Sequence, residues 1–375
     1  MSFVETKEQL ALQEAAREVV GRVVAPVAAA VPAGQKLSPE DLRRIYKALR
    51  PLGYLGSTIS RDFGGAGLSY VDYGLLLEAL TYGPVVLGEI VPPRTINYLG
   101  SEEQKRRWLP KLFSGDWVST AAITEPQAGS DMRAFKTTAT LAGDAYVVNG
   151  QKRWIKLGGV SDLMTLMVVD AAGGLSRLVL ERAVSPWTST EMEAVGIRNL
   201  SFAELTFDNV RVPKENMLPG VQGLRGPLSC LTQARYGITW GVIGAAQACL
   251  KELIAYTATR ELFGRPLNQT QTIQRRLADM ARRITTAQLL CLQLGRLKDR
   301  GRMSATQVSL AKWNNVRMAI DIARDCRDML GGAGISVEYS PMRHMLNLES
   351  VITYEGTETV HELVVGKELT GADAF

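Results

Sequence analysis

Hydrophobic and polar positions near the start of the chain alternate with the period of an α-helix. One apolar stripe recurs every three or four residues, at Leu12, Ala16, Val19 and Val23. A second helix is predicted to begin after Ser38, because serine caps helix starts, and to end near Pro51 and Gly53. A third helix is predicted near residues 73–80. The pattern indicates an N-terminal helical domain over residues 1–118.

From about residue 119 the pattern becomes that of β-strands. Residues 145–148, 163–169 and 178–180 are rich in aliphatic and β-branched side chains, which favour strands. The pair Asn149-Gly150 lies between the first two stretches and predicts a hairpin turn, because both residue types accept positive φ. We expect a compact β domain over residues 119–228.

The rest of the chain returns to helical periodicity with longer helices. An apolar seam alternates four- and three-residue steps through Ile273, Leu277, Met280, Ile284, Ala287, Cys291 and Leu294. This seam predicts a helix of an antiparallel bundle over residues 229–375, with Cys291 in the core rather than as a nucleophile. Further helices are predicted over 230–258, 304–331 and 355–370. No GxGxxG motif follows a predicted strand, which argues against a dinucleotide-binding Rossmann fold.

Composition narrows the class of protein. The chain has 375 residues, 46% hydrophobic and 22% charged, a globular balance that excludes a disordered chain. Apolar runs fall short of the roughly 18 residues of a membrane span, and the N-terminal segment lacks the features of a targeting peptide. The four cysteines are far apart without a CxxC pair, so neither a disulfide framework nor a zinc knuckle is expected. We expect a cytoplasmic protein that binds no membrane.

The histidines and the charge exclude other chemistries. His344 and His361 are the only histidines, so a histidine-rich metal centre cannot form and no metal is predicted. A Ser-His-acid triad would need one of these two as its base; we interpret both as packing or surface residues. The net charge of +5 is spread along the chain without the basic runs of nucleic-acid binders. It suits a small phosphate-bearing ligand or an acidic carrier protein.

Two segments in the β domain are candidates for holding a cofactor. In residues 122–131, Thr124, Ser130 and backbone amides could cradle a phosphate or the edge of a heterocycle, although an ordinary capped turn also explains the segment. In residues 152–156, the indole of Trp154 could pack on a flat cofactor, or be a half-buried strand residue.

A third segment, residues 353–358, offers a candidate base. Glu355 stands between Tyr354 and a glycine, where backbone can approach a ligand closely and an aromatic ring can limit solvation. Partial burial would raise the carboxyl pKa toward that of a working base. Taken alone, a glutamate in this position is more often an acid at a helix start than a catalyst.

Together these segments resemble the acyl-CoA dehydrogenase family over essentially the whole chain. The motifs that carry the resemblance are Gly64-Gly-Ala-Gly67, Thr124-Glu-Pro-Gln-Ala-Gly-Ser-Asp131, Asn149-Gly-Gln-Lys-Arg-Trp-Ile155, Val210-Arg-Val-Pro213, Arg260-Glu-Leu-Phe-Gly-Arg-Pro-Leu267, Met329-Leu-Gly-Gly-Ala-Gly334 and Tyr354-Glu-Gly-Thr357. The C-terminal half is most similar to glutaryl-CoA dehydrogenase, through Ala234-Arg-Tyr-Gly-Ile-Thr-Trp-Gly241, Leu292-Gln-Leu-Gly-Arg-Leu-Lys-Asp299 and Leu369-Thr-Gly-Ala-Asp-Ala-Phe375.

The resemblance implies an α+β multidomain fold and a bound FAD. The family has an N-terminal helical domain, a middle β-barrel and a C-terminal four-helix bundle, usually in a homotetramer, with FAD between barrel and bundle. By matching position, the FAD-binding residues are Thr124, Ser130, Trp154, Ile155, Lys156, Arg260, Phe263, Gln271, Leu330, Gly331, Gly332 and Thr357. Those from Arg260 to Gly332 would hold the FAD of a neighbouring subunit. The implied substrate-binding residues are Ser130, Arg235, Tyr354 and Gly356.

The implied reaction is α,β-dehydrogenation of an acyl thioester carried by CoA or by a carrier protein. Glu355 would remove the α-proton while flavin N5 accepts the β-hydrogen as hydride. Hydrogen bonds to the thioester carbonyl would stabilise the developing enolate. The electrons would pass to an electron-transfer flavoprotein or to oxygen. Alternatives are glutaryl-CoA dehydrogenase proper, a flavin oxidase or monooxygenase on this fold, and a non-catalytic scaffold.

The sequence departs from the family beside the flavin. The family commonly has threonine or serine after the Trp-Ile pair, where this chain has Lys156 and Leu157. A lysine directed at the flavin would favour the reduced, anionic cofactor and alter its reactivity with oxygen. We favour an outward orientation, because burying an unpaired lysine is costly.

A second departure lies in the substrate region. Between Tyr73 and Gly100 the chain is shorter than glutaryl-CoA dehydrogenase, and the arginine that receives the distal carboxylate there has no clear counterpart. Arg94 is near, but it falls past the gap. We therefore expect an acyl group other than glutaryl; the alternative is that Arg94 turns into the site.

Overall fold

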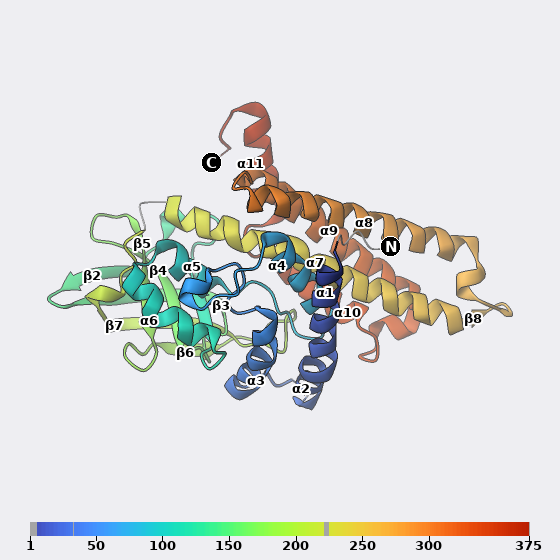
Figure 1. The fold of residues 1–375 in the computed structure, drawn as a ribbon, viewed down its shortest axis with the longest axis horizontal. Coiled ribbons are helices and arrows are strands. Elements are labelled where there is room, and N and C mark those ends of the chain that lie inside the picture. Colours follow the sequence, from blue (N-terminus) through green and yellow to red (C-terminus); the bar gives the residue numbers. More distant parts are fainter. Residues whose placement is uncertain (1–5, 33, 221–224, 375) are drawn as a thin grey trace.

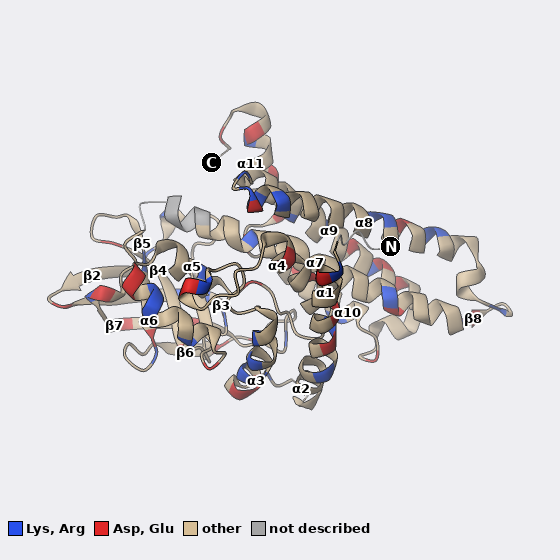
Figure 2. Cartoon of the chain, in the orientation of Figure 1, with Lys and Arg blue, Asp and Glu red and all other residues tan. Residues whose placement is uncertain are grey.

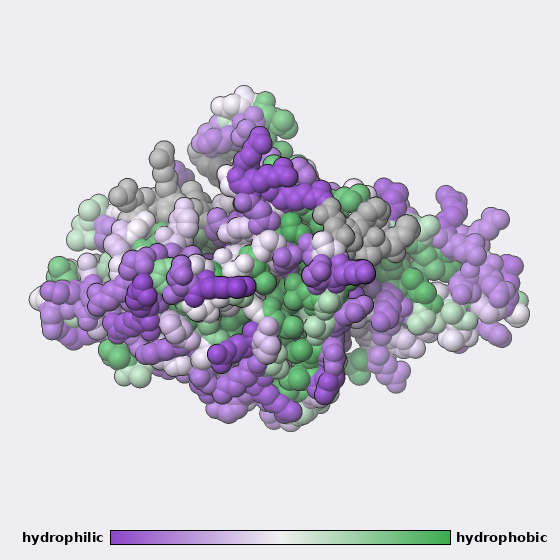
Figure 3. Space-filling view, in the orientation of Figure 1, coloured by the Kyte–Doolittle hydropathy of each residue, from purple (hydrophilic) through white to green (hydrophobic). Residues whose placement is uncertain are grey.

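The computed structural model describes residues 6–32, 34–220 and 225–374, with the backbone alone for 225–229. Phe375, the last residue of the motif that begins at Leu369, lies outside the described residues. Figure 1 shows an elongated molecule with the β domain at one end, the long helices at the other, and the N-terminal helices packed along both. Basic and acidic side chains are interspersed along the chain (Figure 2). Hydrophilic residues cover most of the face seen in Figure 3, and apolar residues gather near its middle.

The predicted N-terminal stripe forms a helix, although its buried positions differ. The first helix, α1, spans Lys7–Val19 and continues through a π-helical turn, Val20–Val24, into α2, Ala25–Ala30. The buried positions are Gln13, Ala16, Val20, Val24 and Val27. They match the predicted stripe at Ala16 and are offset by one residue elsewhere. Leu12, Val19 and Val23 of the predicted stripe are partly buried and pack against the same core.

The second predicted helix is present with the predicted cap. Helix α3, Pro39–Leu49, begins with a capping box between Ser38 and Asp41, and Gly53 at φ 76° follows the short 3-10 turn that ends it. The predicted helix near residues 73–80 is α4, Tyr70–Leu80, which is buried along most of its length. The remaining N-terminal helices are α5, Val91–Leu99, and α6, Glu102–Phe113.

The middle of the chain forms one seven-stranded, curled sheet. Its path runs β1-β4-β2-β3-β7-β6, and β5 pairs with β4. The strands are β1 Ser119–Ala122, β2 Thr138–Ala142, β3 Ala145–Lys156, β4 Leu163–Val169, β5 Leu175–Glu181, β6 Thr188–Glu191 and β7 Phe202–Pro213.

The predicted hairpin turn at Asn149-Gly150 is wrong. Strand β3 runs through both residues, and the β2–β3 turn lies instead between Ala142 and Ala145. The pairing with β7 shifts register between Val148 and Gly150, which marks a bulge. Gly150 has φ 143°, and a Cβ atom there would lie 2.6 Å from Thr137 Cα. This glycine therefore serves a close strand contact rather than a turn.

The C-terminal region is a helical bundle, as predicted. Its long helices are α7 Arg225–Thr259, α8 Gln271–Asp299 and α9 Ala305–Met329, joined by α10 Pro341–Val351 and α11 Glu358–Thr370. Along α8 the predicted seam is buried from Met280 to Leu294, while Ile273 and Leu277 are partly buried. A small hairpin of β8, Glu261–Leu262, and β9, Arg265–Pro266, joins α7 to α8.

Two details of the bundle were not predicted. Helix α10 was missed, and α11 begins at Glu358 with Thr357 as its cap, so Glu355 lies in the preceding loop rather than in the helix.

In α7, the stretch Cys230–Thr259 is long and apolar enough to cross a membrane, but 67% of its most apolar window is buried within the protein. Its apolar side chains thus pack in the bundle core.

Candidate active site

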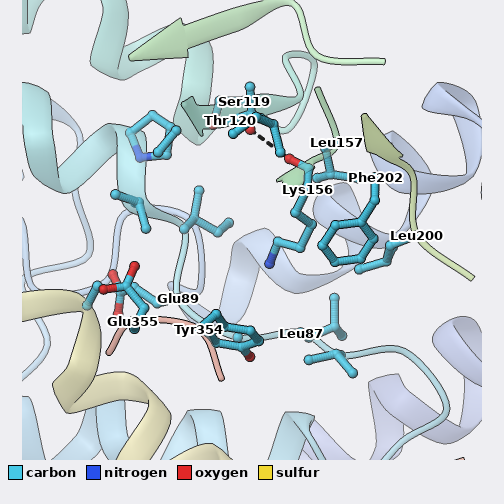
Figure 4. Close-up of a pocket in the computed structure, with 18 of the residues that line it drawn as sticks. Leu87, Glu89, Ser119, Thr120, Lys156, Leu157, Leu200, Phe202, Tyr354 and Glu355 are labelled. Atoms are coloured by element: carbon cyan, nitrogen blue, oxygen red, sulfur yellow. Dashed lines mark hydrogen bonds between the residues drawn. The ribbon is translucent and has the colours of Figure 1, made fainter. Parts of the chain in front are cut away.

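A cavity of about 230 Å³ lies between the sheet and the helices. One wall comes from β1, β3 and their adjoining loops, and the other from segment 85–92, helix α7 and the loop before α11. Figure 4 shows the labelled side chains of both walls facing each other. The sheet wall includes Ser119, Thr120, Ala121, Ile123, Thr124, Trp154, Ile155, Lys156, Leu157, Leu200 and Phe202. The helical wall includes Val85, Val86, Leu87, Gly88, Glu89, Ile90, Ala234, Ile238, Tyr354 and Glu355.

Glu355 lies on the helical wall in a backbone held by two cations. Its φ is 56°, in the left-handed region, and Gly356 follows at φ 93°. The guanidinium of Arg235 donates from Nε to the carbonyl of Glu355 at 2.9 Å. The amine of Lys312 donates to the carbonyls of Tyr354 and Gly356 at 2.7 and 2.6 Å. Three successive carbonyls are thereby fixed, which maintains an uncommon backbone conformation.

The carboxyl group of Glu355 is electrostatically prepared to accept a proton. Burial raises its pKa above the ordinary value and Glu89 adds to the rise, while Arg235, Lys312 and Arg177 oppose it. Its Oε2 atom is buried and has no hydrogen-bond partner among the described residues. A carboxylate with a raised pKa and a free oxygen in a cavity is suited to general-base chemistry.

A buried ion pair that the sequence analysis missed organises the sheet wall. Lys152, on β3, donates to Glu125 Oε1 and to the carbonyl of Ile123, both at 2.8 Å. The Glu125 carboxylate also accepts from the amides of Lys136 at 2.6 Å and Thr137 at 2.9 Å. Burial alone would raise the pKa of Glu125, but Lys152 and these donors lower it to about 2. The loop that carries Thr124 is thereby joined to β3.

A second bulge positions the residues of the predicted Trp-Ile motif. The β3–β7 register shifts between Lys152 and Ile155, and Trp154 has φ 63°. Trp154 is 54% exposed on the cavity rim, whereas Ile155 is buried. A bulge redirects side chains in this way. The structure therefore brings Thr124, Trp154, Ile155 and Lys156 to one wall.

The expected outward orientation of Lys156 is wrong. The side chain lines the cavity, and Figure 4 shows its amine directed toward the wall that carries Glu89, Tyr354 and Glu355. Desolvation lowers the pKa of Lys156, while Glu355 and Glu89 counteract that fall. The two carboxylates compensate in part for the burial that had favoured an outward lysine.

The other candidate residues do not line the cavity within one chain. Ser130 is exposed on the loop after β1, and Thr357 accepts from the amide of Val360 as the cap of α11. Phe263, on the turn of the β8–β9 hairpin, is 96% exposed. Figure 1 shows this hairpin at the opposite end of the molecule from the β domain. Also outside the lining of the cavity are Arg235, Gly356, Arg260, Gln271, Leu330, Gly331 and Gly332.

Arg94 lies behind the cavity wall rather than in it. Its Nε donates to Glu89, and its two terminal nitrogens donate to Thr58 Oγ1 at 3.0 Å and Ser57 Oγ at 3.2 Å. Glu89 also accepts from the hydroxyl of Tyr73 at 2.6 Å. Glu89 lines the cavity and Arg94 does not. The side chain presented to a ligand here is thus an acid.

The geometry of the cavity fits a flavin. A flat ring with one polar edge requires an apolar slot with hydrogen-bonding groups at one side, and the sheet wall offers Ile155, Leu157 and Phe202 beside Thr120 and Thr124. Glu355, whose buried Oε2 has no partner among the described residues, lines the cavity on the other wall. No group of three or more His, Cys, Asp and Glu side chains able to hold a metal occurs within the described ranges.

Comparison with known proteins accounts for all three parts of the chain. Three family models match: the acyl-CoA dehydrogenase N-terminal domain over residues 6–116, the middle domain over 120–210 and the C-terminal domain over 221–370. A short-chain specific acyl-CoA dehydrogenase of Clostridium acetobutylicum is 31% identical, with 98% of this chain and 100% of that protein covered. The human mitochondrial short-chain specific enzyme is 33% identical over 86% of this chain and 81% of its own.

Solved structures show the same fold. A glutaryl-CoA dehydrogenase from Mycobacterium smegmatis in complex with FADH2 is 36% identical, covers 99% of this chain and 96% of its own, and superposes with a TM-score of 0.89. Butyryl-CoA dehydrogenase from Megasphaera elsdenii is 28% identical. The match covers 98% of this chain and 100% of that one, with a TM-score of 0.90. A chain from a study of the electron transferring flavoprotein of Acidaminococcus fermentans is 29% identical. The match covers 99% of this chain and 100% of that one, with a TM-score of 0.91. The resemblance seen in the motifs is confirmed, and the chain belongs to the acyl-CoA dehydrogenase family.

Proposed function

We propose that this protein catalyses the FAD-dependent α,β-dehydrogenation of an acyl thioester, with Glu355 as the base. The observation that carries the proposal is the carboxyl group of Glu355, with a raised pKa and a buried, unpartnered oxygen in a cavity that fits a flavin. Family membership supports the cofactor and the reaction class.

The base acts on the substrate carbon next to the thioester carbonyl. Glu355 accepts the α-proton at its free carboxyl oxygen. Arg235 and Lys312 hold the surrounding carbonyls, so the carboxyl group keeps its position as the proton moves. Bound flavin supplies the oxidising chemistry by accepting the β-hydrogen as hydride.

The sheet wall would hold the flavin ring. Trp154 and Ile155 offer apolar surface, and Thr124 offers a hydroxyl on a loop fixed by the Glu125–Lys152 pair. Lys156 extends from the same wall, so a cation would lie beside the ring.

We propose a homo-oligomer, a tetramer by family resemblance, in which Arg260, Phe263 and Gln271 contact the FAD of a neighbouring subunit. The exposed Phe263 at the far end of the molecule supports this arrangement. An isolated chain cannot bring these residues to its own cavity.

One observation favours an oxidase as a second candidate. The cavity-facing Lys156 stands where the family commonly has a hydroxyl side chain, and a nearby cation stabilises anionic reduced flavin. Oxygen consumption with peroxide release, in the absence of another acceptor, would identify an oxidase. Dependence on an electron-transfer flavoprotein would identify a dehydrogenase.

Two further proposals concern the carrier of the acyl group and the location of the enzyme in the cell. The acyl carrier is CoA or a carrier protein, both of which are acidic and suit a net charge of +5. All four cysteines are buried and unpaired, which supports a cytoplasmic location.

Anaerobic mixing with acyl thioesters tests the proposed function directly. We expect purified protein to be yellow, to release FAD on denaturation and to lose flavin absorbance when a suitable thioester is added. Colourless protein that cannot be reconstituted with FAD would contradict the proposal and leave a scaffold role.

A further inference from the structure

We propose that Glu89 selects the acyl group, favouring chains that carry a hydrogen-bond donor, either a hydroxyl or an ammonium group, over chains that end in a carboxylate. This inference rests on the proposed function, because it concerns the substrate of the same cavity. It goes beyond that function by naming a chemical class of acyl group.

Glu89 is the second carboxylate in the cavity. Around it the helical wall is apolar, formed by Val86, Leu87, Ile90 and Ile238. Its side chain is only 5% exposed, so little water solvates it. An acyl chain without a donor would cover this carboxylate and offer no hydrogen bond in return, which is unfavourable.

Two hydrogen bonds fix the position of the Glu89 carboxylate. One oxygen accepts from Nε of Arg94 and the other from the hydroxyl of Tyr73 at 2.6 Å. The Arg94 guanidinium also stacks 4.7 Å from the centroid of the Tyr73 ring. A carboxylate has about four acceptor positions, so two remain for a ligand after these two bonds.

A glycine on the facing helix makes room for the carboxylate. A Cβ atom at Gly237, in α7, would lie 2.7 Å from Glu89 Oε2. Any larger residue at this position would displace the carboxylate. The packing of α7 thus keeps Glu89 at the cavity wall.

The charges in the cavity indicate what a ligand must supply. Lys156 is the one basic side chain among the described residues that line it, and it extends toward the wall of Glu89 and Glu355. Arg94 is not free to receive an acyl carboxylate, because it is bound to Glu89, Thr58 and Ser57 behind the wall. A terminal carboxylate would therefore meet an acid, whereas a hydroxyl or ammonium group would meet an acceptor.

Isosteric thioesters test the proposal. Butyryl-, 3-hydroxypropionyl- and 3-aminopropionyl-CoA differ only in whether the terminal group is methyl, hydroxyl or ammonium, and succinyl-CoA adds the anionic case. Because the heteroatom is bonded to the β-carbon that gives up hydride, it also changes the intrinsic reactivity of the thioester, and this effect cancels when wild type and Glu89→Gln are compared on the same thioester. We expect the wild-type to Glu89→Gln ratio of kcat/KM for anaerobic flavin reduction to be about tenfold or more higher for 3-aminopropionyl-CoA than for butyryl-CoA, and lowest for succinyl-CoA. Comparison of the hydroxyl-bearing thioester with the ammonium-bearing one shows which kind of donor Glu89 favours.

The variant Glu89→Gln removes the charge and keeps an acceptor. It should lose the ammonium preference and react faster with succinyl-CoA than wild type does. Gly237→Ala is the matched variant that leaves the charge but displaces the carboxylate, and it should reduce the same preference. Flavin content and thermal midpoint serve as controls for folding, and Glu89→Asp should restore part of the preference.

Two failures can be told apart. If butyryl-CoA reduces the flavin best and Glu89→Gln leaves the ranking unchanged, the role of Glu89 is wrong while the proposed function stands. If no thioester on CoA or on carrier protein reduces the flavin, the proposed function itself is wrong.

Discussion

Lys312 holds the backbone on both sides of Glu355, donating to the carbonyls of the residues before and after it. Burial lowers the pKa of Lys312 to about 7, against the opposing effect of Glu355. The Lys312 amine therefore fixes the geometry of the loop that carries the base, and it adds a positive charge there below about pH 7. Lys312→Met should retain FAD and slow thioester-dependent flavin reduction by about 10- to 100-fold through misplacement of the carboxyl group. Stopped-flow absorbance measures this rate; an unchanged rate would contradict the positioning role.

Glu355→Gln tests the base itself. The variant should bind FAD normally and lose about two to four orders of magnitude in the rate of flavin reduction by a thioester, as expected for removal of a general base. Chemical reduction by dithionite is the control, and it should be unaffected. A thioester rate equal to wild type would assign the role to another group.

The same substitution should stabilise the protein at neutral pH. Burial raises the folded-state pKa of Glu355 above its unfolded value, so ionisation costs stability as pH rises from about 4.5 through the folded pKa. Glutamine carries no such cost. We expect thermal midpoints of variant and wild type to agree below pH 4.5 and to separate in favour of the variant as pH rises. A constant difference at all pH values would contradict this explanation.

Lys156→Thr should shift the redox properties of the bound flavin. Removal of the cavity-facing cation should lower the reduction potential and weaken sulfite binding, each tenfold change in a two-electron equilibrium corresponding to about 30 mV. Potentiometric titration without substrate measures the first and absorbance titration the second. Wild-type values in both measurements would show that the amine does not act on the flavin.

The buried Glu125–Lys152 pair should be costly to break. Glu125→Gln leaves the fully buried Lys152 without its counter-charge, for an expected loss of about 3–5 kcal/mol in the free energy of unfolding. The double variant Glu125→Gln, Lys152→Met removes the unpaired charge and keeps an oxygen acceptor for the backbone amides, so it should recover much of that loss. Denaturant titration of the three proteins, with FAD content measured in parallel, tests the prediction; equal stability of the single and double variants would contradict it.

Mixed oligomers test whether a neighbouring subunit completes the site. Arg260→Ala should be inactive because it has lost affinity for FAD, and Glu355→Gln should be inactive because it lacks the base. When the two are unfolded and refolded together, some sites combine an intact Glu355 with an intact Arg260 from the neighbour. We expect activity to reappear in the mixture, up to about a quarter of wild type for random pairing. Absence of recovery would place Arg260 in its own subunit's site.

Local signals in the sequence predicted much of the fold. The capping box at Ser38 and the apolar seam of α8 depend on neighbours in the chain, and both are present. The prediction of a turn at Asn149-Gly150 failed because the glycine is required by a close contact with Thr137, in the loop before β2. A pattern of residue types does not contain such contacts.

The site was predicted in part for the same reason. Glu355 and Trp154 lie within motifs, and both are at the cavity. Lys156 was oriented wrongly, because its favourable partners lie on distant segments. Glu89 and Lys312 were missed; only the unusual occurrence of charged residues in otherwise apolar stretches could have indicated them.

The burial of the four cysteines affects how readily peroxide oxidises this protein. Burial raises the pKa of every one of these thiols, to about 12 for Cys291 and Cys326, so the reactive thiolate form is scarce at neutral pH. A flavoprotein that reacts even slowly with oxygen produces peroxide beside its own side chains, and peroxide attacks thiolates. Peroxide formed by this chain therefore meets few reactive thiolates, and we expect it to oxidise partly exposed methionines such as Met132, Met192 and Met303 before the cysteines.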